Sequence, residues 1–105
     1  MREIKESDWK LFRQLWAVAL ERYCQRVLDE SERLHRDAGQ STHERFLAIY
    51  QLFRQRDKEL ASLFDDFRRS TASLQLAAIH ARGLLTDEEF ARFSEETRNA
   101  LNPAK

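Results

Sequence analysis

Glycine and proline are almost absent from this chain, and that scarcity limits the possible folds more than any other feature. The two glycines are Gly39 and Gly83, and the single proline is Pro103. Because these residue types most often end helices, the stretches 1–38 and 40–82 contain no strong helix terminator. The chain is also rich in Leu, Ala, Glu, Gln and Arg, which favour helices. We therefore predict an all-α fold built from a few long helices.

The first helix is expected over residues 7–37. Ser7 is a candidate N-cap, Asp8 follows in the electropositive first turn, and Gly39 can end the helix in the left-handed conformation. With 105 residues, the chain has room for one domain, 1–105, and one modest core.

A second helix is expected over residues 42–82. Ser41 and Glu44 have the Ser-x-x-Glu spacing of a capping box. From Phe46 to Ala78 the apolar residues keep one stripe at a period of 3.6 residues, which favours a single continuous helix. The alternative is a bend near residue 56 or residue 70, where polar residues or weak helix formers interrupt the pattern. Together the two helices predict a long antiparallel hairpin.

A short third helix is expected over residues 86–99. Thr86 and Glu89 repeat the capping-box spacing, and Phe90 and Phe93 then share one face. The acids of "TDEEF" lack the alternating ligands and central glycine of a calcium loop. We interpret them as stabilising a helix N-terminus.

Residues 74–90, "LQLAAIHARGLLTDEEF", combine a leucine-rich helix end, a glycine, two aliphatic residues, threonine, acids and phenylalanine. This order resembles the helical motif called the short C-terminal domain. The resemblance covers less than a fifth of the chain and ends after Phe90, where "ARFSEETRNAL" lacks the lysine-rich continuation of that motif. It implies a helix-turn-helix tail and no defined chemistry.

The first helix is apolar around most of its circumference. A helix of this kind is usually covered on more than one side, and one neighbouring helix covers only one. We therefore expect a homodimer in which two hairpins form a coiled-coil-like helical bundle. The predicted subunit interface comprises Trp9, Phe12, Trp16, Leu20, Tyr23 and Val27.

The distribution of charge gives a second hypothesis. The formal net charge is zero, and residues 1–40, 41–83 and 84–105 each stay within two charges of neutrality, so nucleic acid is not an expected partner. An arginine face on the second helix, formed by Arg54, Arg68 and Arg69 with Arg45 as a further member, could still contact phosphates or an acidic protein. The alternative function is therefore a nucleic-acid-associated regulator.

No enzyme, cofactor or metal is expected. His35 and His43 would lie near each other at the hairpin end, but only Glu32 and His35 have the Glu-x-x-His spacing of a helical-bundle metal site. The apolar runs are too short to span a bilayer, and the N-terminus does not resemble a secretory signal. The single Cys24 fits a reducing compartment, so we expect a cytoplasmic protein. Its expected function is that of a self-associating interaction or adaptor module, which could also bind another protein.

Overall fold

The computed structural model describes residues 3–101, and every regular element in that range is a helix, which confirms the all-α prediction. The elements, in chain order, are α1 (Glu6–His35), α2 (Thr42–Phe64), the short 3-10 helix η1 (Arg69–Thr71), α3 (Ala72–Ala81), α4 (Asp87–Ala91) and α5 (Glu95–Leu101).

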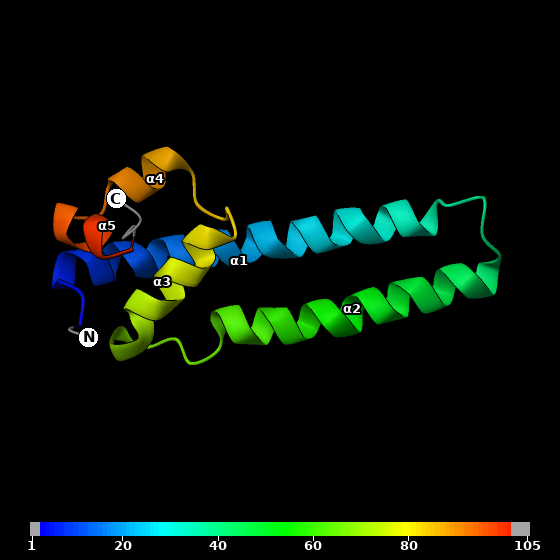
Figure 1. Ribbon diagram of the computed structural model, residues 1–105, viewed down its shortest axis with the longest axis horizontal. Coiled ribbons are helices and arrows are strands. Elements are labelled where there is room, and N and C mark those ends of the chain that lie inside the picture. The colour runs from blue at the N-terminus through cyan, green and yellow to red at the C-terminus, as the bar shows by residue number, and fades with distance from the viewer. Residues whose placement is uncertain (1–2, 102–105) are drawn as a thin grey trace.

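The two long helices α1 and α2 lie side by side and run in opposite directions (Figure 1). The predicted capping box begins α2: Glu44 N donates to Ser41 Oγ at 3.0 Å, and Ser41 N donates to Glu44 Oε1 at 2.8 Å. Arg45 then donates to the carbonyl of His35 at 2.7 Å, which joins the two helix ends across the loop. At the other end of α1 the first helical residue is Glu6, so Ser7 lies inside the first turn and is not the N-cap.

The continuous helix predicted over 42–82 is broken in the structure. α2 ends at Phe64, Asp65 is extended, and Asp66 adopts a positive φ of 60°. The break therefore lies at residues 65–68, between residues 56 and 70, the two positions predicted for an alternative bend. Phe67 leaves the helical path and packs on aromatic rings of α1, while Thr71 Oγ1 donates to the carbonyl of Asp66 at 2.6 Å. These contacts stabilise a turn that the helical period did not indicate.

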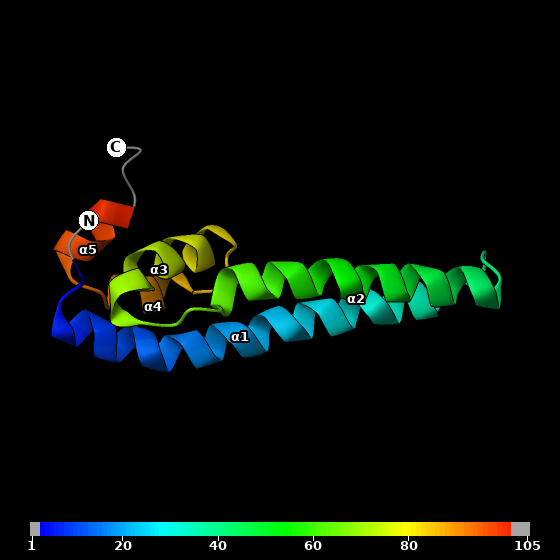
Figure 2. The ribbon, with the colours of Figure 1, turned by 90° about the horizontal axis from the view of Figure 1, so that it is seen from below.

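Because of this break, α3 turns back and crosses the first half of α1 instead of extending α2 (Figures 1 and 2). α3 ends at a turn in which Gly83 has a φ of 69°, a conformation that suits glycine. Two arginines of α1 hold this turn: Arg26 donates to the carbonyls of Arg82 and Gly83 at 2.9 and 2.7 Å, and Arg22 donates to the carbonyl of Leu84 at 2.9 Å.

The predicted helix 86–99 consists of two short helices, α4 and α5, that change direction at residues 92–94. Thr86 and Glu89 form the expected capping box at the start of α4. The start of α5 is capped from far along the chain, because Ser94 N donates to the carboxylate of Asp8 in α1 at 3.0 Å. This long-range hydrogen bond therefore lies at the junction between α4 and α5.

The core lies in the half of the molecule where α3, α4 and α5 gather around the N-terminal part of α1 (Figure 2). Its largest fully buried side chains are Phe12, Leu76, Ile79, Leu84 and Phe93. The other half consists only of α1, α2 and their loop (Figure 1). The molecule measures 52 × 25 × 25 Å, so the second half of the hairpin projects from the core as a two-helix arm.

Candidate interaction surface

The apolar circumference of α1 is covered largely by its own chain. Of the six residues predicted to form a subunit interface, Phe12 and Tyr23 are buried in the core, where a second chain does not reach them. The other four, which are half-buried and pack against that core, are Trp9, Trp16, Leu20 and Val27. Only one helix of the same chain was expected to cover α1, but α2 and α3 both pack against it.

The two tryptophans contact the loop that breaks the second helix. The ring of Phe67 stacks on Trp16 with centroids 4.4 Å apart and an interplanar angle of 11°, and it lies 5.2 Å from Trp9. Phe64, the last residue of α2, meets the edge of Trp16 at 5.7 Å. These rings thus form an aromatic cluster between α1 and the end of α2 that is nearest the core.

Tyr23 marks the point where the core ends and the arm begins. Its hydroxyl donates to Glu59 Oε1 at 2.8 Å, and Arg56 lies 3.2 Å from Glu59 and 3.4 Å from Glu30. Burial, together with the hydrogen bond to Glu59, raises the pKa of Tyr23 to about 12. The bond from Tyr23 lowers the pKa of Glu59 and outweighs the opposing effect of burial. This network fixes the register of α1 against α2.

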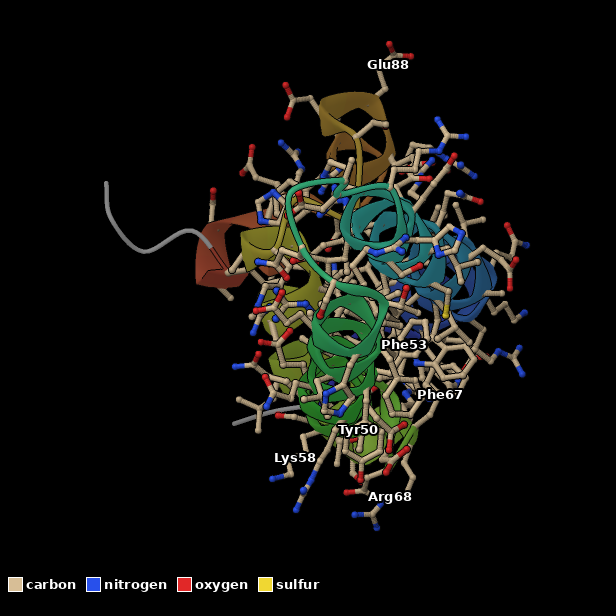
Figure 3. The ribbon with its side chains drawn as sticks, turned by 90° about the vertical axis from the view of Figure 1, so that its right-hand side faces the viewer. Tyr50, Phe53, Lys58, Phe67, Arg68 and Glu88 are labelled. Atoms are coloured by element: carbon tan, nitrogen blue, oxygen red, sulfur yellow. The ribbon has the colours of Figure 1, made fainter. Side chains whose placement is uncertain are left out.

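Beyond this network, α2 presents apolar side chains to solvent. Phe46, Tyr50 and Phe53 have exposed fractions of 64%, 55% and 43%. In the view from the loop end, Phe53 lies on the same side of α2 as Phe67, with Tyr50 beside it (Figure 3). Leu28 of α1 and Leu47 of α2 are also exposed. We call these five side chains the distal apolar surface.

A groove of about 610 Å³ lies between the two helices at this surface. Its lining residues come from α1 and α2: Tyr23, Cys24, Val27, Leu28, Tyr50, Phe53, Arg54, Arg56, Asp57 and Leu60. Most of these side chains are apolar, and the charged ones come from the stretch 54–57 of α2. A groove of this kind fits an apolar side chain or helix face better than a charged small molecule.

The second candidate site, the arginine face, is not brought together by the fold. Arg68 lies in the break and Arg69 directly after it. Each pairs with an acid of its own chain: Arg68 with Asp66 at 2.7 Å and Arg69 with Glu6 at 2.8 Å. Arg45 is at the opposite end of α2, bound to a carbonyl of α1. Arg54 lines the groove instead of joining a basic patch.

A third cluster, which sequence reasoning missed, holds the C-terminal helices to α1. The buried Asp8 carboxylate accepts hydrogen bonds from Ser94 N at 3.0 Å, from Ser94 Oγ at 2.7 Å and from Thr97 Oγ1 at 2.7 Å. Burial opposes ionisation of Asp8, but these hydrogen bonds outweigh it and lower its pKa. The available signal was the order Ser94-Glu-Glu-Thr97, which is typical of a helix start.

A separate acid, Glu89 of α4, also joins the tail to α1. Arg22 donates to both of its carboxylate oxygens, at 2.6 and 2.9 Å. The hydrogen bond from Arg22 is the main cause that lowers the pKa of Glu89 to about 2. Asp8 and Glu89 therefore both have structural partners, and their two separate contacts hold the tail against α1.

Comparisons of the chain with protein-family models, with curated proteins and with solved structures found no match. Among the helices between residues 3 and 101, none is both long and apolar enough to cross a membrane. In the same range, the acids, histidines and cysteine form no group of three or more with metal-binding geometry. The distal apolar surface is the feature with the clearest functional meaning.

Proposed function

We propose that this protein is a non-enzymatic helical interaction module that self-associates through its distal apolar surface. The observation that carries this proposal is the exposure of Phe46, Tyr50 and Phe53 on successive turns of one helix. Large exposed apolar patches on small domains are often sites of protein contact. Figure 3 shows Phe53 on the same side of α2 as Phe67, and Phe67 stacks on the half-buried Trp16, a residue of the interface expected from sequence.

The size of the surface fits a modest interface. An aromatic side chain has about 150–250 Å² to bury, so the three exposed rings leave roughly 300 Å² of aromatic surface in water. Leu28 and Leu47, about half exposed, raise the apolar total to roughly 450 Å². A standard interface buries about 800 Å² per partner, a little over half of it apolar. The surface therefore suffices for a dimer.

Self-association is tested by sedimentation or light scattering over a concentration series. We expect the wild type to form a dimer, and the double variant Tyr50→Glu with Phe53→Glu to remain a monomer with unchanged helical content. Charges placed at an interface lose solvation without gaining a partner, whereas on a monomer both positions remain in water.

The matched control is Leu74→Glu. Leu74 is 66% exposed on α3, away from the arm, so its substitution should leave the mass unchanged. A wild type that stays monomeric across the micromolar range would contradict the proposal. A double variant that still dimerises would show that the distal apolar surface is not the contact.

The alternative, a nucleic-acid-associated regulator, gains no support from the arginines named for it. Arg68 and Arg69 are already paired with carboxylates, and Arg45 and Arg54 lie apart from them along α2. We therefore do not put it forward as a second function.

A further inference from the structure

We propose that the partner is a second copy of this chain whose α2 lies antiparallel to the first, about a two-fold axis close to residues 50–53. The inference rests on the proposed self-association and adds its geometry. It is carried by the spacing of side chains on α2, by the groove beside them and by the position of one acidic residue.

Two stripes of mostly apolar side chains run along α2, each with the alternating three- and four-residue spacing of a coiled coil. The first stripe, turned towards α1, comprises Ile49, Leu52, Arg56, Glu59 and Leu63. Of these, Arg56 and Glu59 bond to Glu30 and Tyr23 of α1. The second comprises Phe46, Tyr50, Phe53, Asp57, Leu60 and Phe64, at intervals of four and three residues. This alternation places the side chains along one face of the helix, and it is typical of helices that pair with another helix.

The second stripe is covered at one end only. Phe64 is buried against Trp16, and Leu60 is half-buried where it packs against the core. From Phe53 back to Phe46 the same stripe is exposed. Segment 46–53, "FLAIYQLF", which includes the exposed part of the stripe, contains no charged residue, although 34% of the chain is charged. An uncharged, heptad-spaced segment of two turns fits an apolar helix as its partner.

A second copy provides such a helix and a place for its side chains. The groove between α1 and α2 adjoins the stripe and is lined by Cys24, Val27 and Leu28 on the α1 side. In a two-fold pair, each copy offers the same aromatic side chains and the same groove, so each contact occurs twice. Aromatic side chains that fill apolar pockets near the centre of an interface contribute most to affinity.

The acid on the stripe decides the direction of pairing. In a parallel pair, Asp57 would face Asp57 of the second copy, and the two carboxylates would repel each other. In an antiparallel pair about residues 50–53, they are about 16 Å apart along the helix axis, at 1.5 Å per residue. Each Asp57 then lies opposite the first turns of the other α2, where His43 and the positive helix end are found.

Distances between identical spin labels test this geometry. Single labels are placed at four exposed positions of α2 outside the stripe and the groove, in a Cys24→Ser background: His43→Cys, Gln51→Cys, Gln55→Cys and Ala61→Cys. Antiparallel pairing predicts the shortest distances at positions 51 and 55. The distances at 43 and 61 should be longer by about 10 to 20 Å, from the helical rise. The Cys24→Ser protein and each labelled variant must keep the wild-type helical content and dimer mass.

The possible results separate the two proposals. A minimum near the middle of α2 supports the antiparallel pair. Equal short distances at all four positions would mean a parallel pair, and long distances at all four in a stable dimer would mean contact through another face. Both of these results overturn the geometry and leave self-association intact. A protein that stays monomeric removes the geometry and the proposed function together.

Discussion

Asp8 and Glu89 illustrate how single carboxylates join distant parts of this chain. Asp8 contacts Ser94, 86 residues away, and Glu89 contacts Arg22, 67 residues away. Both have lowered pKa values in the folded protein. An acid with a lowered pKa stabilises the fold at pH values above its unfolded pKa, and this contribution is lost as the pH falls through its folded pKa.

For Glu89 the expected window lies between about pH 4.5 and pH 2, because its pKa falls from 4.5 to about 2 on folding. We predict that Glu89→Gln lowers the free energy of unfolding by about 1–3 kcal/mol at pH 7, since a charged hydrogen-bonded pair is lost. As the pH falls through this window, the wild type should lose its advantage over the variant. Urea denaturation of both proteins from pH 7 to pH 2 measures this difference. A difference that is independent of pH would mean that the Arg22 pair does not stabilise the fold.

At the scale of elements, the break at 65–68 determines the fold. Had α2 continued to residue 82, it would have run on beside the first half of α1 and past its N-terminal end, and residues 72–81 would not turn back across α1 as α3 does. Instead, the turn places Phe67 on Trp16, and Gln75 of α3 donates to the carbonyl of Asp65. The turn requires a left-handed residue at Asp66, a conformation that asparagine, aspartate and glycine adopt more readily than other residues.

We predict that Asp66→Gly changes stability by less than about 1 kcal/mol, because glycine accepts a positive φ but is more flexible when unfolded. Asp66→Val should cost about 1–2 kcal/mol or more, since a β-branched side chain is strained in this conformation. Thermal or urea unfolding followed by circular dichroism gives both values. Equal losses in the free energy of unfolding for the two variants would show that the stability of the turn does not depend on the backbone conformation of Asp66. Asp65→Val serves as a control at an extended position.

At the scale of the whole molecule, the structure divides into a packed half and a two-helix arm. Its radius of gyration is 16.9 Å, against about 13 Å for a compact domain of about 100 residues. The arm is held by the Tyr23 network and by Leu52, its one buried apolar residue between residues 24 and 59. An arm with so little internal core gains stability when a partner covers it, because binding to the folded state shifts the folding equilibrium.

The charge distribution of the whole molecule leads to a further expectation. With zero net charge and the arginines of 68–69 paired, we predict no binding to duplex DNA tighter than the nonspecific range of about 10⁻⁴ to 10⁻⁶ M at physiological salt. Fluorescence anisotropy at several salt concentrations tests this. Tight, salt-dependent binding that is abolished by Arg68→Glu with Arg69→Glu would restore the nucleic-acid hypothesis.

The sequence alone determined the features that depend on neighbouring residues. The helical class follows from the scarcity of glycine and proline. The capping boxes at Ser41 and Thr86 formed as predicted because both partners lie within three residues of each other. Helix α1 begins and ends within two residues of its expected bounds for the same reason.

Only the tertiary structure decided where the second helix breaks and which surface remains open. The helical period between Phe46 and Ala78 was compatible with one long helix, since apolar residues on both sides of the break keep the same phase. The break forms because Phe67 and α3 gain more contact by folding onto α1 than by extending α2. The position of the break therefore depends on side chains some fifty residues away in the chain, such as Trp16. The same contacts cover Phe12 and Tyr23 but leave Tyr50 and Phe53 in water, because α3 is too short to reach along the arm.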